Sequence, residues 1–173
     1  MSTVDLSTLI RDVPDFPTPG IVFKDIMPLL ADRHGLRAAV DGLAAWAEPR
    51  RPDVILGAEA RGFILGAALA LELDCGFVAA RRPGKLPSRV ISAEYALEYG
   101  VNSLEVHADA IAAGQRVLIH DDVLATGGTA RAIADLADQL GGEVVGLGFV
   151  IELEFLHGRE QLGGYDVHSL ITY

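Results

Sequence analysis

The sequence predicts an α/β fold in which a mainly parallel, twisted sheet is flanked by helices on both faces. Short apolar runs typical of buried strands alternate along the chain with helical patterns of about a dozen residues. Half of the 173 residues are hydrophobic, which is typical of a globular chain. No repeat, low-complexity tract or flexible linker divides the chain, so we predict a single domain over residues 1–173.

The first predicted elements are an extended segment, two helices and a strand. Val13–Phe23 contains three prolines and a glycine, and it is expected to be extended because proline has no backbone N–H to donate. Leu36–Trp46 has apolar residues at helical spacing, and Asp53–Gly57 is typical of a short buried strand. Arg61–Leu73 then continues as a helix.

The second half of the chain repeats this alternation. Gly76–Ala80 is a second strand, whereas residues 81–106 alternate in polarity only near their ends and are either a loop or a hairpin. Ligands of such folds lie beyond the carboxyl ends of the strands, so the loops at those ends are the candidates for a site. The remaining predicted elements are the strand Val117–His120, the helix Ala130–Leu140, the strand Val144–Ile151 and the strand Val167–Tyr173.

Composition excludes several function classes. The formal net charge of −10 argues against general nucleic-acid binding. The apolar run Phe63–Leu71 is far shorter than the roughly 20 residues of a membrane-spanning helix. The single cysteine, Cys75, cannot form an internal disulfide and fits a cytoplasmic protein. Residues 75–93 contain four basic residues and no acidic one, which indicates either a solvated loop or a segment that binds a small anion.

The most informative segment is Val117–Thr129, where an apolar strand is expected to end at Asp121 and Asp122 before a small-residue loop opens a helix. Gly127 and Gly128 let backbone N–H groups approach an oxyanion, and the helix N-terminus adds a partial positive charge. Two threonine hydroxyls add further donors. The pattern suits a monophosphate and is not a Walker loop, although a polar turn before a threonine-capped helix would have the same sequence.

The two carboxylates need another explanation, because they repel phosphate. They suit sugar hydroxyls, which donate hydrogen bonds, or a hydrated Mg²⁺ ion. Side chains alternate along a strand, so one of Asp121 and Asp122 can face the ligand while the other acts as a structural cap.

The Asp-Asp and Ala-Thr-Gly-Gly-Thr pattern resembles the phosphoribosyl pyrophosphate signature of the type I phosphoribosyltransferase family. Further segments are similar to its adenine-specific branch and cover essentially the whole chain in the same order. The resemblance implies the type I fold, with a small N-terminal hood over residues 1–35 and a flexible catalytic loop over residues 81–106. It also implies transfer of the 5-phosphoribosyl group from phosphoribosyl pyrophosphate to adenine, giving AMP and pyrophosphate. The similar segments are Phe16–Asp25, Glu59–Phe63, Arg81–Pro87, Tyr95–Gly100 and Ile151–Leu170.

The resemblance assigns phosphate-binding roles to several residues. Arg61, Arg81 and Lys85 are expected at the pyrophosphate, with Lys85 reaching the neighbouring subunit of a homodimer; without the resemblance, Arg61 would equally be a surface charge where a helix begins. Asp121 and Asp122 are expected near the ribose hydroxyls, with Mg²⁺ held through substrate and water and by these two carboxylates in addition. The residues expected around the 5′-phosphate are Ala125, Thr126, Gly127, Gly128 and Thr129.

The resemblance also identifies residues that are expected to bind the purine base. Adenine is expected against Val22, Phe23, Lys24 and Val123. Phe23 would lie against the purine ring or would be a core aromatic. Lys24 stands where the family usually has arginine, and it lacks the planar fork of that side chain.

In the catalytic loop, Glu98 is the candidate proton acceptor, with Tyr99 beside it. Without the resemblance, Glu98 would be an exposed loop acid with an aromatic neighbour.

The sequence leaves two other functions open. The same chemistry on another purine would need a donor opposite a carbonyl at the six position. A phosphoribosyl pyrophosphate-sensing regulator would need a basic nucleic-acid surface, which the acidic composition opposes. An ATP-dependent kinase would need the phosphate loop that this chain lacks.

Overall fold

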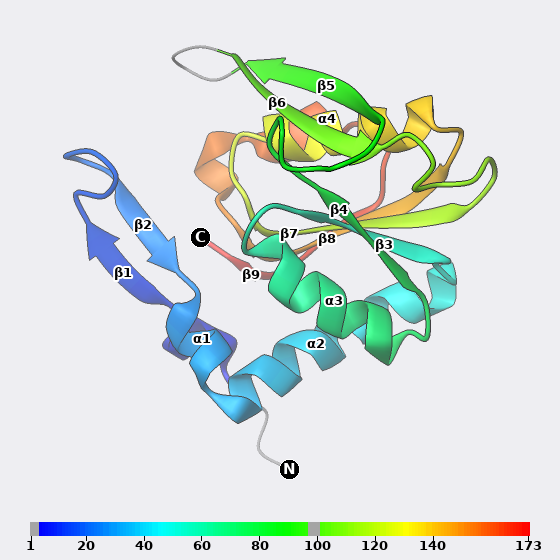
Figure 1. Ribbon diagram of the computed structural model, residues 1–173. Coiled ribbons are helices and arrows are strands. Elements are labelled where there is room, and N and C mark those ends of the chain that lie inside the picture. Colours follow the sequence, from blue (N-terminus) through cyan, green and yellow to red (C-terminus); the bar gives the residue numbers. More distant parts are fainter. Residues whose placement is uncertain (1–3, 97–100) are drawn as a thin grey trace. The chain divides into compact units, whose positions relative to one another are not determined.

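The computed structural model describes residues 4–96 and 101–173, and it confirms the α/β class (Figure 1). The chain forms two compact units, Met1–Gly42 and Leu43–Tyr173. The first unit includes the described part of the predicted hood and extends beyond it to residue 42. In the part of the chain that the structure describes, no helix is both long enough and apolar enough to cross a bilayer.

The first unit is built around a small antiparallel hairpin. After the 3-10 turn η1 (Leu6–Leu9), β1 (Arg11–Pro14) pairs with β2 (Val22–Asp25). The segment predicted to be extended therefore supplies the hairpin's turn and the facing ends of both strands. The short helix α1 (Met27–Ala31) follows, and α2 (Arg33–Ala47) begins in this unit.

The second unit contains a five-stranded sheet in the order β4-β3-β7-β8-β9, and every neighbouring pair in it is parallel. The predicted mainly parallel sheet is thus confirmed. Its strands are β3 (Val54–Ala58), β4 (Gly76–Ala80), β7 (Arg116–Leu124), β8 (Glu143–Glu152) and β9 (Val167–Thr172).

Helices cover both faces of this sheet (Figure 1). On one face α3 (Gly62–Glu72) and the end of α2, Leu43–Ala47, pack on Ile55 and Leu118. On the other face α4 (Gly128–Gln139) packs on the side chains that alternate with these along β3 and β7. The remaining short 3-10 segments are η2 (Glu48–Arg50), η3 (Glu154–Leu156) and η4 (Gly158–Leu162).

The described part of residues 81–106 is not one continuous loop. β5 (Val90–Ala96) and β6 (Val101–His107) pair in antiparallel register, so the hairpin is the correct one of the two alternatives. Ala93 and Leu104 belong to the same buried cluster as α4, and burial of these side chains explains why strands form here.

The strand predicted as Val117–His120 is longer in the structure, where it continues past Asp121 and Asp122 instead of ending at them. β7 runs on to Leu124 because it stays paired with β8 through Leu124 and Glu152, whereas its pairing with β3 ends at His120. Both aspartates therefore lie in a strand that extends past its shorter neighbour at the carboxyl edge of the sheet.

Candidate active site

The loop from Ala125 to Thr129, called the phosphate loop below, joins β7 to α4 and curves around a small hollow. The hollow has a volume of about 50 Å³, several times the roughly 10–15 Å³ that a water molecule needs. Gly127 adopts a φ of +87°, which L side chains rarely adopt, directly before α4. The lining residues are Val123, Leu124, Ala125, Thr126, Gly127, Thr129 and Ala130.

The hollow has the electrostatics of an anion site. It lies at the N-terminus of the 12-residue helix α4, where the first backbone N–H groups have no carbonyl partner within the helix. No side chain in the described part of the chain caps this end. Those N–H groups and the partial positive charge of the helix are therefore available to an oxyanion.

Asp121, Asp122 and Arg61 form one cluster at the same edge of the sheet. The Asp122 side chain is buried and forms an ion pair with Nε of Arg61, the residue before α3. Asp121 Oδ1 accepts a hydrogen bond of 2.8 Å from the Asp122 N–H, and it would lie only 3.0 Å from a Cβ at Gly62. Both carboxylates are thus held close to the start of α3.

The electrostatics of this cluster favour a positive partner. Burial and the neighbouring Asp122 carboxylate raise the pKa of Asp121 well above its ordinary value, although Arg61 acts in the opposite direction. Burial and a neighbouring like charge both disfavour the charged carboxylate, and a proton or a cation at Asp121 relieves that cost.

Arg81 is held at the carboxyl end of β4, next to the end of β3. Its Nε donates to Glu59 Oε2 at 3.1 Å, and its Nη1 donates to the carbonyl of Lys85 at 3.1 Å. Burial raises the pKa of Glu59, but hydrogen bonds from the Arg82 N–H and Arg81 outweigh it and lower that pKa overall. The predicted anion ligands Arg61 and Arg81 therefore follow neighbouring strands, and Lys85 is exposed.

The predicted adenine residues of the first unit lie in its hairpin. Val22 is exposed, and Phe23 is half-buried with its ring edge-to-face on Phe16 at 5.3 Å. Lys24 forms an ion pair of 2.7 Å with Asp12 across the hairpin. The other predicted adenine contact, Val123, lines the hollow of the phosphate loop.

Glu98 and Tyr99 lie outside the described residues, so their predicted roles remain predictions.

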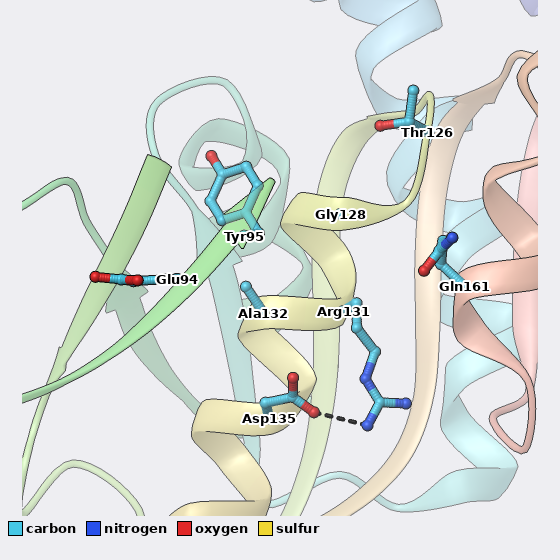
Figure 2. A pocket seen from close by; sticks show the side chains of 8 residues that line it. All are labelled: Glu94, Tyr95, Thr126, Gly128, Arg131, Ala132, Asp135 and Gln161. Carbon is cyan, nitrogen blue, oxygen red and sulfur yellow. Dashed lines mark ion pairs between the residues drawn. The ribbon is translucent and has the colours of Figure 1, made fainter. Parts of the chain in front are cut away.

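Sequence reasoning missed a second pocket beside the phosphate loop. It has a volume of about 310 Å³ and lies where β5, α4 and η4 meet. Figure 2 shows Arg131 and Gln161 on one side of α4 and Tyr95 on the other, with an ion pair of 2.7 Å joining Arg131 to Asp135. The position of Arg131, within one turn of the phosphate loop, is the signal that could have identified it. The lining residues are Glu94, Tyr95, Thr126, Gly128, Arg131, Ala132, Asp135 and Gln161.

Comparison with known proteins agrees with this geometry. Residues 30–166 match the family model described as a phosphoribosyl transferase domain. The chain is 53% identical over 173 residues to the adenine phosphoribosyltransferase of Thermotoga maritima, covering 100% of both chains.

Two solved structures are similar over nearly the whole chain. The crystal structure of adenine phosphoribosyltransferase from Thermoanaerobacter pseudethanolicus superposes with a TM-score of 0.96 at 51% identity, covering 98% of both chains. The Saccharomyces cerevisiae enzyme, complexed with an imino-altritol bisphosphate and adenine, superposes with a TM-score of 0.92 at 38% identity, covering 96% of both.

Proposed function

The chain belongs to the adenine phosphoribosyltransferase family, and from this membership we infer that it transfers the 5-phosphoribosyl group of phosphoribosyl pyrophosphate to adenine in purine salvage. The products are AMP and pyrophosphate. The observation that carries this conclusion is the glycine-threonine hollow at the N-terminus of α4, next to two carboxylates, in a chain that matches named family members over its full length.

We propose that the phosphate loop binds the 5′-phosphate. The residues with this role are Ala125, Thr126, Gly127, Gly128 and Thr129. Support comes from the start of α4, which no side chain of the described residues caps, and from the hollow, which four of these five residues line. The fifth, Gly128, lines the adjoining pocket.

The leaving pyrophosphate is assigned to Arg61, Arg81 and Lys85. Guanidinium groups match phosphate oxygens with paired N–H donors, and the carboxylates of Asp122 and Glu59 hold the two arginines in place. As the bond between the anomeric carbon and pyrophosphate breaks, positive charge builds on the ribose. Asp121 and Asp122 stabilise that charge and accept hydrogen bonds from the ribose hydroxyls.

Adenine then forms the new bond to the anomeric carbon through a ring nitrogen, which must lose its proton. Glu98 is assigned as the acceptor of that proton, with Tyr99 beside it. The adenine edge is assigned to Val22, Phe23 and Lys24 in the hairpin of the first unit. Val123, near the end of β7, is assigned the same role.

Mg²⁺ is the expected cofactor, and the residues present fit it. The described residues contain no group of three or more His, Cys, Asp or Glu side chains that could hold a metal. Mg²⁺ usually binds through one or two carboxylates together with substrate phosphates and water, and the raised pKa of Asp121 favours a cation near that carboxylate. Asp121 and Asp122 would hold the ion, which would neutralise charge on the leaving pyrophosphate.

The enzyme is further proposed to be a cytoplasmic homodimer. Ile64, Ala67 and Leu71 form an exposed apolar stripe along α3, and Leu71 is 84% exposed. A helix that is apolar on its outer face is usually covered by a partner, and sedimentation velocity tests this. The free thiol of Cys75 and a phosphorylated substrate both fit the cytoplasm.

The preference for adenine is tested by incubating the protein with phosphoribosyl pyrophosphate, Mg²⁺ and one of four bases: adenine, guanine, hypoxanthine or xanthine. AMP should form from adenine, with much lower turnover of the other three bases. Turnover of a six-oxo purine in preference to adenine would overturn the base assignment. A crystal structure with AMP should place its phosphate at residues 125–129, and a nucleotide bound elsewhere would overturn the site.

A further inference from the structure

We propose that Gly158, Arg159 and Glu152 are positioning residues that hold the phosphate loop in its binding shape from behind. The proposal rests on the proposed function, because it concerns how the same loop recognises the 5′-phosphate. None of the three residues lines the hollow itself, so they would act only through the loop.

The first observation is a direct packing of backbone on backbone. A Cβ at Gly158 would lie 2.1 Å from the Ala125 carbonyl oxygen and 3.0 Å from the Gly127 nitrogen. In the opposite direction, a Cβ at Gly127 would lie 2.3 Å from the Gly158 carbonyl oxygen. Because Gly158 is buried, the loop has no room to move toward η4, and neither glycine can carry a side chain without displacing the other segment.

The second observation is the network that fixes Gly158 in place. The neighbouring Arg159 donates two hydrogen bonds to the Glu152 carboxylate, from Nε at 2.8 Å and from Nη2 at 2.5 Å. Its Nη1 also donates to the Val167 carbonyl at 2.8 Å, and the Ser169 hydroxyl donates to Glu152 Oε2 at 2.7 Å. One arginine thus ties the segment after β8 to both β8 and β9.

Glu152 is well placed to transmit this constraint. It is only 5% exposed, and it is the last residue of β8, paired with Leu124 at the end of β7. The Leu153 N–H donates to the Leu124 carbonyl at 2.9 Å, one residue before the phosphate loop begins. The hydrogen bond from Arg159 lowers the pKa of Glu152, so the carboxylate remains charged and paired near neutral pH.

The loop is therefore clamped at its start by the β7–β8 pairing and supported behind its centre by Gly158. Backbone N–H groups bind an oxyanion well only when they are held at the correct geometry before the ligand arrives. Loosening this support should weaken binding of the 5′-phosphate and leave recognition of adenine, which has no phosphate, nearly unchanged.

The main test is Gly158→Ala, with Gly163→Ala as its matched control in the same segment. A Cβ at Gly163 would meet only the Glu160 oxygen at 3.8 Å, an ordinary contact. Displacing the loop by about 1 Å should raise the KM for phosphoribosyl pyrophosphate and the Kd for ribose 5-phosphate by about 10- to 100-fold. The KM for adenine, and kcat at saturating phosphoribosyl pyrophosphate, should stay within about threefold of wild type.

A second pair of variants covers the case in which Gly158→Ala does not fold. Glu152→Gln weakens the pairing with Arg159, and its control is Glu143→Gln at the other end of β8, where the glutamate is largely exposed and pairs with Arg116 at 3.2 Å. Only Glu152→Gln should raise the KM for phosphoribosyl pyrophosphate. Arg159→Lys keeps the charge but loses the planar fork, so its effect should lie between wild type and Arg159→Ala.

The outcomes separate this inference from the proposed function. If the wild-type protein forms no AMP, the proposed function fails. If the wild type is active but the folded variants bind ribose 5-phosphate as tightly as wild type does, the positioning role is wrong. An equal loss of affinity for adenine and for ribose 5-phosphate would also overturn it, because that result indicates general damage to the fold.

Discussion

At the scale of single residues, burial decides which charges the candidate site can use. Asp122 is buried, and its carboxylate forms an ion pair with Arg61. His120, one residue before the aspartates, has no solvent exposure, and burial lowers its pKa to about 4. Its Nδ1 lies 2.9 Å from the Gly148 carbonyl and must donate the proton, since a carbonyl only accepts. The ring is therefore neutral at physiological pH and cannot act as a cationic phosphate ligand.

Asp121→Asn should stabilise the protein at neutral pH and reduce its activity. The raised pKa means that the folded state binds a proton more tightly than the unfolded state, so the wild type loses stability as the pH rises above the ordinary value of 3.8. The asparagine variant has no charge to bury. The free energy of unfolding of the variant should therefore exceed that of the wild type by an amount that grows from pH 4 to pH 8, as measured by urea titration. Loss of a hydrogen bond to a charged group, about 1.5–3 kcal/mol, should lower kcat/KM about 10- to 100-fold. An advantage that shrinks as the pH rises would contradict this account.

Glu98→Gln tests the assignment of the proton acceptor. The amide keeps the size of the side chain but cannot accept a proton, so kcat should fall about 100-fold or more. The Kd for ribose 5-phosphate, measured by calorimetry, should stay unchanged because the phosphate loop is intact. Unchanged turnover in this variant would remove Glu98 from the mechanism.

At the scale of elements, close packing of α3 on the sheet sets the position of Arg61 and the aspartates. A Cβ at Gly57 of β3 would lie 2.6 Å from the Phe77 ring of β4, and one at Gly66 of α3 would lie 2.9 Å from it. The Phe63 ring packs edge-to-face on Phe77 at 5.7 Å, which limits how far that ring can move aside. Two glycines thus make room for one aromatic ring, and α3 sits close to the carboxyl end of β7.

Gly66→Ala should therefore have opposite effects in two backgrounds. In the wild type, overpacking against Phe77 costs about 1–3 kcal/mol and outweighs the helix propensity of alanine, which is about 1 kcal/mol better than that of glycine. In a Phe77→Leu background the clash is relieved, and the same substitution should raise the free energy of unfolding by up to about 1 kcal/mol. Denaturant titration of the four proteins measures both effects. Equal effects in the two backgrounds would show that Phe77 is not the obstacle.

At the scale of the whole molecule, one segment of this acidic chain carries only basic charges. The net charge is −10, yet residues 75–93 carry four basic residues and no acidic one. Arg81 is held by Glu59, while Lys85 is exposed on the same segment. An exposed lysine has the reach to serve a site on another subunit, as the proposed homodimer would require.

Mixing two inactive variants tests whether Lys85 acts in the partner's site. Homodimers of Arg61→Ala and of Lys85→Ala each carry two damaged sites. A mixed dimer concentrates both substitutions in one site and leaves the other intact, so random exchange of subunits should restore about a quarter of wild-type activity. Purified variants are mixed after mild dissociation and assayed for AMP formation, with each variant alone as the control. Absence of recovery would place Lys85 in the site of its own subunit.

The sequence by itself determined the alternation of strands and helices in the sheet domain and the position of the small-residue loop after β7, because both depend on local patterns. Hydrophobic periodicity predicted the strands and helices of the sheet domain, and Gly127 with its small neighbours predicted a loop open to an oxyanion. The tertiary structure decided which distant groups meet: it extended β7 through Asp121 and Asp122 by pairing with β8, and it paired Asp122 with Arg61. The sequence also did not predict that Gly158 packs against the backbone of the phosphate loop. Strand length, ion pairing and backbone contact depend on partners far along the chain, and only the packed fold brings those partners together.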